Sequence, residues 1–274
     1  MLEKFTYTNN FNEKLEFGKG SLFVNENDLR DFAWEISTKN NRISGFKKGI
    51  VQKTIPVILK CETEAEGIQL RNTIFEVFEK DVITEQHGKI QIGDYYLRCF
   101  ITGSKKTEYL LSRKYMVVTL TVQTDHPEWI KETTTNHNLS EEESGGFLDF
   151  PYDFQFDFKN PNIKTSINNF GLVPCDFIMT IRGNVVNPTL YIGNHKYSVS
   201  VTVEEGEHLT IDSKNKTIVL TKANNEKVNC FSKRDRDSYI FEKIPTGTVD
   251  ISSTINDLKF TMTLLEERSE PKWI

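Results

Sequence analysis

Strict alternation of apolar and polar residues marks three segments of this chain as β-strands: "VQKTIPVILKC", "YMVVTLTV" and the stretch that begins at Leu258. Successive side chains of a strand point to opposite faces, so a period of two indicates a strand with one buried face. β-Branched residues, which strands favour, are frequent in all three. The predicted inward positions are Val51, Ile55, Val57, Leu59 and Cys61, then Met116, Val118, Leu120 and Val122, then Leu258, Phe260, Met262 and Leu264.

One segment repeats with helical spacing instead, from about residue 63 to residue 81. Thr63 and Glu66 form a capping box, in which each side chain accepts a hydrogen bond from the other residue's backbone amide. The spacing of the apolar residues predicts a wide buried face, with the helix laid across a sheet. This face comprises Ile68, Phe75, Phe78 and Val82, flanked by Leu70, Ile74 and Val77.

Turn signals punctuate the second half of the chain. Gly193-Asn194 lies between two strand-like runs, which is typical of a tight β-hairpin, and a second turn is expected around Lys214-Asn215. No further convincing helix follows residue 81. Short strands with closely spaced turns predict an all-β sandwich or barrel over residues 147–270.

An aromatic residue occupies every second position in "FPYDFQFDF", from Phe150 to Phe158. Two interpretations are open, a ligand-binding surface or the first strand of a domain whose inner face is large. The second is favoured, with Phe154, Phe156 and Phe158 in the core, because buried phenylalanine is common and an exposed aromatic strand promotes aggregation. Tyr152 is the one member left open to solvent.

A polar segment without periodicity, Lys131–Gly146, ends in a double glycine and has the composition of a linker. The fold class predicted is therefore mainly β, in two parts. Residues 1–136 form a β-rich domain with one α-helix, residues 137–146 a linker, and residues 147–274 a β-sandwich.

Charge and composition narrow the possible functions of the 274 residues. Residues 1–139 carry 19 basic and 19 acidic side chains, so residues 140–274 supply the whole net charge of −5. No basic stripe is evident, and nucleic-acid binding is therefore not expected. No apolar run approaches the roughly 18 residues of a membrane helix, and the N-terminus lacks a signal-peptide core, so we expect synthesis in the cytoplasm and no membrane insertion.

A search for catalytic chemistry finds no supporting motif. The four cysteines are widely spaced, and the five histidines lack the neighbours that a metal site requires. A pair of acids could serve a glycosidase, but Asp149, Asp153 and Asp157 share one predicted strand, so a polar outer face is the preferred interpretation. The sequence predicts no catalytic residue, metal or cofactor, and a protein that is not an enzyme.

The order of these elements resembles that of the distal tail proteins of long, non-contractile-tailed phages and prophages of Gram-positive bacteria. The similarity covers nearly the whole chain, from "FAWEISTKNNRISGFKKGIVQKTIPVIL" and "LSRKYMVVTLTVQTDHPEWI" to "GFLDFPYDFQFDF", "NPTLYIGNHKYSVSVTVEEGEHLTIDSKNKTIVL" and "LLEERSEPKWI". This resemblance implies a virion protein of the tail tip that forms a homo-hexameric ring. The first domain would be a ring-forming belt and the second a galectin-like sandwich. The ring would join the tail tube protein to the tail-associated hub or fibre protein and, in some phages, to a receptor-binding protein.

Two sets of surface residues follow as candidates. For the ring interface we expect the basic segment around residues 42–50 and the strand that ends at Trp129, because a loop of this charge suits an acidic partner surface. The alternative function is a carbohydrate-binding adhesion module that recognises host cell-wall polysaccharide through tyrosines of the second domain, since tyrosine both stacks and hydrogen-bonds. The ring candidates are Arg42, Phe46, Lys47, Lys48 and Trp129, and the outer-domain candidates are Tyr152, Tyr191 and Tyr239.

Overall fold

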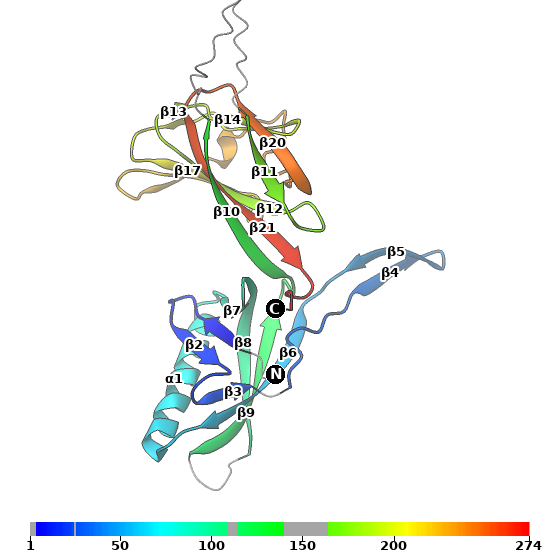
Figure 1. The fold of residues 1–274 in the computed structure, drawn as a ribbon, viewed down its shortest axis with the longest axis vertical. Coiled ribbons are helices and arrows are strands. Elements are labelled where there is room, and N and C mark those ends of the chain that lie inside the picture. Colours follow the sequence, from blue (N-terminus) through cyan, green and yellow to red (C-terminus); the bar gives the residue numbers. More distant parts are fainter. Residues whose placement is uncertain (1–3, 25, 109–113, 140–163, 274) are drawn as a thin grey trace, which may run out of the picture. The chain divides into compact units, whose positions relative to one another are not determined.

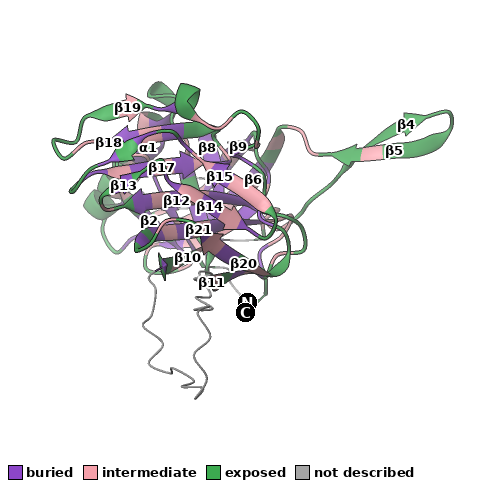
Figure 2. Ribbon diagram, turned by 90° about the horizontal axis from the view of Figure 1, so that it is seen from above, coloured by how far each residue is buried: buried purple, intermediate pink, exposed green. Residues whose placement is uncertain are grey.

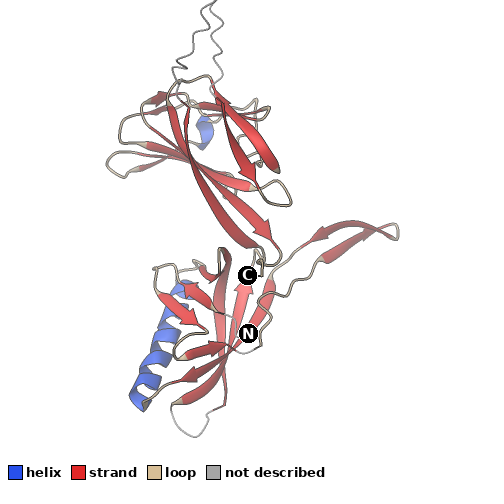
Figure 3. Cartoon of the chain, in the orientation of Figure 1, coloured by secondary structure: helices blue, strands red, loops and turns tan. Residues whose placement is uncertain are grey.

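The computed structural model describes residues 4–24, 26–108, 114–139 and 164–273. The chain divides into two compact units (Figure 1), the first comprising Met1–Lys131 with Glu267–Ile274 and the second Glu132–Glu266. Strands dominate both units, and the protein is mainly β as expected (Figure 3). The aromatic segment Phe150–Phe158, with Tyr152, lies outside the described residues.

The first unit contains two antiparallel sheets that share one long, bent strand. β8 pairs with β7 through its first residues and with β9 through its later ones, where β-bulges change its direction. The orders are β8-β7-β1-β2 and β3-β6-β9-β8. The elements are β1 (Phe5–Thr8), β2 (Lys14–Phe17), β3 (Leu22–Val24), β6 (Val51–Lys60), α1 (Glu64–Ile83), β7 (Gly88–Ile92), β8 (Tyr95–Glu108) and β9 (Tyr115–Thr124), with a hairpin of β4 (Glu35–Lys39) and β5 (Arg42–Lys47).

The alternating segments of this unit form strands as predicted. In β6 and β9, Ile55, Val57, Leu120 and Val122 are buried while their neighbours face outwards. These residues belong to one apolar core, together with residues of α1 and of the other strands of the first unit. Within it, the Phe5 and Phe17 rings stack at 4.6 Å between centroids.

The α1 helix begins at the predicted capping box, where both hydrogen bonds between Thr63 and Glu66 form. Ile74, Val77 and Phe78 of the predicted face are buried, but the prediction is wrong for three other members. Ile68, Phe75 and Val82 are 40%, 59% and 40% exposed. The helix packs through a narrower face than predicted, and this face also includes the polar Asp81. The buried residues of the helix are Gly67, Ile74, Val77, Phe78 and Asp81.

The segment taken as a linker begins as a strand. β10 (Trp129–Leu139) continues through eight polar residues, and the chain passes from the first unit to the second within it. Its inward positions in the second unit include Thr135 and His137, so the apolar alternation that would mark a strand is missing. The division between the units also differs from the predicted one, because the last residues, from Glu267, return to the first unit.

The second unit is a sandwich of two antiparallel sheets around its own core. The larger has the order β19-β18-β17-β12-β21-β10 and the smaller β11-β20-β14-β15, and β13 pairs with β16. Leu258, Phe260, Met262 and Leu264 face this core as predicted. The strands are β11 (Lys164–Asn169), β12 (Asp176–Arg182), β13 (Val185–Val186), β14 (Thr189–Ile192), β15 (His195–Ser198), β16 (Thr202–Val203), β17 (His208–Asp212), β18 (Thr217–Thr221), β19 (Lys227–Asn229), β20 (Gly247–Ser253) and β21 (Leu258–Arg268), with one 3-10 turn, η1 (Phe231–Lys233).

Both predicted turns are present in the sandwich. Gly193 and Asn194 join β14 to β15 with Ile192 directly opposite His195. Gly193 has φ of 58°, the left-handed conformation that a tight hairpin requires and that glycine adopts without strain. The second turn joins β17 to β18 around Lys214 and Asn215.

Candidate assembly surface

The β4–β5 hairpin extends away from the sheets of the first unit (Figure 1). Its two strands pair only with each other among the described strands. Nearly every residue of the hairpin is exposed (Figure 2). An isolated two-stranded hairpin is marginally stable in water, so this one calls for either strong local turn chemistry or a partner.

Local turn chemistry is provided by an Asn-Asn turn. Lys39 pairs with Arg42, which leaves a two-residue loop. Asn40 and Asn41 have φ of 51° and 57°, and positive φ at both positions is the mark of a type I′ hairpin. Asparagine tolerates this left-handed conformation better than other non-glycine residues. The sequence therefore specifies the hairpin even without contacts to the core.

One face of the hairpin is apolar. Ile36 pairs with Phe46, and Thr38 pairs with Ile43 after a β-bulge, so these side chains point to the same side. Trp34 lies two residues before Ile36, so its side chain points to the same side. Its ring meets the Phe46 ring edge-on, with 6.5 Å between the ring centroids. The exposed fractions are 48% for Trp34, 57% for Ile36, 59% for Ile43 and 60% for Phe46. We call these four residues the hairpin apolar face.

The opposite face of the hairpin is charged. Lys47 Nζ lies 3.1 Å from Glu35 Oε2 across the two strands, and both side chains are more than half exposed. Lys39 and Arg42 extend this face toward the turn. The hairpin thus has one apolar and one predominantly basic side.

The base of the hairpin is fixed to the first unit by two lysines. Lys48 Nζ lies 4.6 Å from the centre of the Trp34 ring and 3.7 Å from Glu128 Oε1, and its side chain is 5% exposed. Lys53 is buried and donates hydrogen bonds to the backbone carbonyls of Asp28 and Asp31. Burial lowers the pKa of Lys53, and the two aspartates oppose this effect. These contacts hold the chain on both sides of the hairpin.

The predicted ring residues divide into two groups. Arg42, Phe46 and Lys47 are exposed on the hairpin, where a partner could reach them. Trp129 is fully buried in the core and cannot serve as a surface contact, and the Lys48 side chain is engaged within the chain. A large aromatic residue at the end of a strand can lie in the core or on the surface. The sequence around Trp129 does not distinguish these two positions.

The hairpin apolar face as a whole was not identified from the sequence, because which side chains share it depends on the register of β4 and β5. The signal was available: Trp34, Ile36 and Thr38 alternate with polar residues, and an Asn-Asn pair follows.

Comparison with known structures identifies the fold. No protein-family model and no curated protein matches the sequence. The SPP1 Dit protein, a paradigm of the hub adsorption apparatus in phages that infect Gram-positive bacteria, matches with a TM-score of 0.60 and 11% identity, over 96% of this chain and 99% of that one. The chain has the fold of a phage distal tail protein.

Two further structures share this distal tail fold. A chain of the phage p2 baseplate in its activated conformation with calcium has a TM-score of 0.65 at 14% identity and covers 99% of this chain and 100% of that one. The corresponding structure with strontium has a TM-score of 0.63 at 13% identity and covers 98% of this chain and 99% of that one. The similarity therefore includes both units.

The outer-domain tyrosines do not meet at one site in this distal tail fold. Tyr191 is half-buried on β14, between the buried Leu190 and Ile192, so it faces away from the core. Tyr239 is 56% exposed and meets the Phe241 ring edge-on. Neither lines the one groove described for the second unit, and Tyr152 is outside the described residues.

That groove lies on the solvent side of the larger sheet and has a volume of about 260 Å³. Arg182 stands directly opposite Lys259 in the β12–β21 ladder, and no carboxylate lines the groove. Arg182 donates a hydrogen bond of 3.0 Å to Thr261 Oγ1, which donates one of 2.9 Å to Asn136 Oδ1. The remaining lining residues are His137, Asn138 and Phe260.

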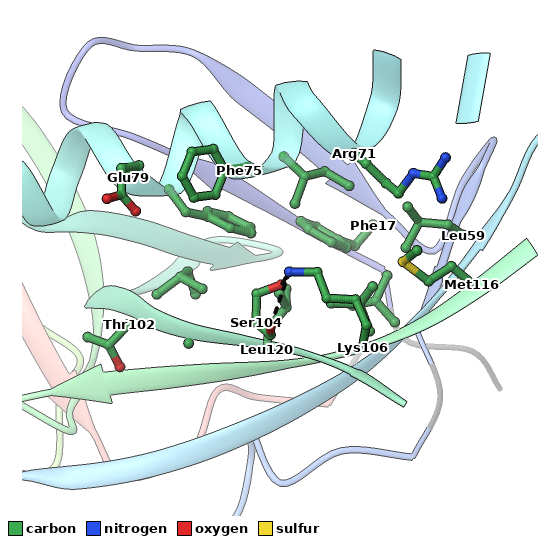
Figure 4. Close-up of a pocket in the computed structure, with 16 residues that line it drawn as sticks. Phe17, Leu59, Arg71, Phe75, Glu79, Thr102, Ser104, Lys106, Met116 and Leu120 are labelled. Atoms are coloured by element: carbon green, nitrogen blue, oxygen red, sulfur yellow. Dashed lines mark hydrogen bonds between the residues drawn. The ribbon is translucent and has the colours of Figure 1, made fainter. Parts of the chain in front are cut away.

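Within the described ranges, no group of three or more histidine, cysteine or carboxylate side chains is arranged to hold a metal ion. No helix in that part of the chain has the length and apolar character that crossing a membrane requires. Features of the described residues that a partner could contact include the hairpin, the groove on the second unit and a cavity beside α1 (Figure 4).

Proposed function

We propose that this chain is a structural subunit of a phage tail tip, and that six copies form a ring between the tail tube protein and the tail-associated hub or fibre protein. The distal tail fold over the whole chain supports a place in the tail tip. The second unit would project from the ring, where a receptor-binding protein could attach. In this role the protein assembles with others and catalyses no reaction.

The hairpin apolar face is the observation that carries this proposal. Four large apolar side chains stand exposed on an element that has no other strand to pair with in the described structure. Exposed apolar patches of this kind mark surfaces that bind another protein. A ring subunit buries such a surface against its neighbour, and the flat hairpin would gain stability from that contact.

A double substitution on the hairpin tests the proposal in assembled tails. Ile36→Ser with Phe46→Ser removes two of the four side chains of the hairpin apolar face. Each contributes about 1.5–3 kcal/mol when it is buried. We expect antibody labelling in electron micrographs to place the wild-type protein at the tail tip and to show the variant absent from it. A matched control, Ser37→Ala with Gly45→Ala, changes two residues that pair on the opposite face and should still be incorporated. Wild-type protein that is absent from the tip would contradict the proposal.

A second candidate function is recognition of host wall polysaccharide by the groove of the second unit. Two cations directly opposite each other in a ladder repel, and Arg182 and Lys259 form such a pair, which only the exposed Asp257, 3.6 Å from Lys259 Nζ, partly balances among the ion pairs of the described residues. A polysaccharide with acidic groups would balance this charge, while Asn136 and Asn138 could bond its hydroxyls.

Titration of the full chain with purified wall polysaccharide of the host strain tests this second function. Arg182→Ala should weaken binding about tenfold or more, since a charged hydrogen bond contributes about 1.5–3 kcal/mol. Lys227→Ala, on the distant edge strand β19, is the control. No binding at millimolar polysaccharide would leave only the structural role.

A further inference from the structure

A row of basic side chains crosses the solvent face of the larger sheet in the second unit. Strands β21, β12 and β17 lie side by side in this sheet (Figure 1). Arg182 stands directly opposite Lys259 on one side and directly opposite His208 on the other. Residues that pair in this way share one face of a sheet, and their neighbours Ile181 and Leu209 point into the core. We call Lys259, Arg182 and His208 the basic row.

The basic row is longer than the groove described above. The groove is lined by Lys259 and Arg182 but not by His208. Neighbouring strands are about 4.8 Å apart, so the row spans roughly 10 Å across three strands. The next ladder position, Thr221 on β18, is uncharged and only 9% exposed, and it separates the row from Lys227 on β19. The basic row is therefore a compact cluster within the sheet.

Few acids balance the basic row among the ion pairs of the described residues. Asp257 lies 3.6 Å from Lys259 Nζ, and both side chains are more than half exposed. Glu207 precedes His208, but its side chain is 6% exposed and lies 2.9 Å from Lys222 Nζ, which neutralises it. Histidine donates hydrogen bonds in both its neutral and its protonated form. The row thus offers donors to acidic groups on all three strands.

A line of neutral polar groups runs beside the basic row. Two residues further along the strands, Thr180 stands directly opposite Thr261 on one side and Thr210 on the other. Asn136 Oδ1 accepts a hydrogen bond of 2.9 Å from Thr261 Oγ1, which extends this line to β10. Hydroxyl and amide groups can bond the hydroxyls of a sugar. The sheet therefore presents acid-binding and hydroxyl-binding groups in two parallel lines.

We propose that this face binds a linear acidic polysaccharide that runs across strands β21, β12 and β17, with at least two of its acidic groups on the basic row and its hydroxyls on the neighbouring threonines. A single acidic group cannot contact Lys259 and His208 together, since they lie two strands apart. The inference rests on the second proposed function and names its ligand class, a chain with closely spaced acidic groups. It also assigns His208 to the site as a residue that determines specificity.

Galacturonic acid oligomers test the required number of acidic groups, because each sugar residue carries one carboxylate. Calorimetric titration of the full chain should show the trimer binding about tenfold more tightly than the monomer, since the trimer adds a second charged hydrogen bond. The methyl ester of the trimer keeps the sugar chain without its charges, and it is the matched control that should not bind. Equal affinities of the trimer and the monomer would overturn the inference, as would a chain that binds wall polysaccharide but none of these oligomers.

Substitutions of His208 test the length of the site. His208→Ala should weaken binding of the trimer about threefold or more, the effect of one lost hydrogen bond, and leave that of the monomer unchanged. His208→Arg should strengthen binding of the trimer by a similar factor. Thr217→Arg adds the same charge at an exposed position of the same face, and Lys227→Ala removes one beyond Thr221. Neither control should change the affinity by more than about twofold, because salt screens exposed charges outside the row.

The outcomes separate this inference from the function on which it rests. A chain that binds wall polysaccharide with no effect of His208 would overturn the longer site and leave the groove. Controls with effects as large as those of His208 would indicate a general attraction between charges and would also overturn it. A wild-type chain that binds neither the oligomers nor wall polysaccharide would remove both the inference and the second function.

Discussion

The missing Cβ atom of Gly88 makes room for a buried hydrogen bond in the first unit. Tyr7 Oη donates to Asp81 Oδ2 at 2.5 Å, and Asp81 Oδ1 accepts the amide of Asn10 at 2.9 Å. Burial, aided by the bond to Asp81, raises the pKa of Tyr7 far above its usual value, so the tyrosine stays a donor. A Cβ atom at Gly88 would collide with both side chains.

Gly88→Ala should therefore lower the free energy of unfolding by about 1–3 kcal/mol, the usual cost of overpacking. Urea denaturation of the full chain measures the effect. Gly45→Ala is the control, because a Cβ atom there meets no other atom within 4 Å. Equal effects of the two substitutions would refute this packing argument.

A buried carboxylate makes the second unit sensitive to acid. Asp176 accepts a hydrogen bond of 2.9 Å from Ser213 and lies 2.9 Å from Lys243 Nζ. Burial acts to raise the pKa of Asp176, but these two partners outweigh it, and the pKa falls below its ordinary 3.8. A depressed folded-state pKa stabilises the protein above the unfolded-state value, and this stabilisation is lost as the pH falls through 3.8 toward the folded-state value.

Asp176→Asn should cost about 1–3 kcal/mol of unfolding free energy at neutral pH, because it removes the carboxylate charge that lies 2.9 Å from Lys243 Nζ. The cost should shrink as the pH falls through 3.8 toward the lower folded-state pKa, because the unfolded wild-type chain then takes up a proton that the folded chain does not yet bind. Urea denaturation at a series of pH values gives both curves. Parallel curves for wild type and variant would show that Asp176 does not titrate as argued.

Two adjacent lysines have different roles in the hairpin. Lys48→Glu should lower the free energy of unfolding by about 1–3 kcal/mol, because it places a shielded carboxylate beside Glu128. Lys47→Glu should change it by less than about 1 kcal/mol, since Lys47 and Glu35 are both solvated. Thermal unfolding of both variants measures the difference. A larger loss for Lys47→Glu would contradict the observed burial.

Helices and strands that are specified by neighbouring residues could be predicted from the sequence. The elements against which they pack could not. The helix start followed from Thr63 and Glu66, whose hydrogen bonds depend on four consecutive residues. The buried face of α1 depends on the sheets beneath it, and so Phe75, apolar and well spaced, was wrongly placed in the core. β10 was mistaken for a linker because His137 and Thr135 fill its inward positions with polar groups.

The candidate assembly surface shows the same difference between local sequence patterns and contacts that depend on distant residues. Arg42, Phe46 and Lys47 could be selected from the sequence as a basic, aromatic segment. Ile36 and Ile43 were missed because which side chains share one face depends on the strand register and on the bulge near Ser37. The burial of Trp129 likewise depends on contacts with residues distant in the sequence.

At the scale of the whole molecule, each of the two units has its own core, and the hairpin belongs to neither. Each unit buries its own apolar cluster. The apolar residues that remain exposed on the hairpin therefore carry the proposed contacts between copies. The proposed role in the tail tip depends on these contacts forming a closed ring and not an open chain.

The mass of the purified full chain in solution tests that claim most directly. The account predicts one dominant species of six times the 31.7 kDa of a single chain, and a shift to the monomer for Ile36→Ser with Phe46→Ser. A wild-type chain that remains a monomer at every concentration, and that does not join purified tails, would contradict the account.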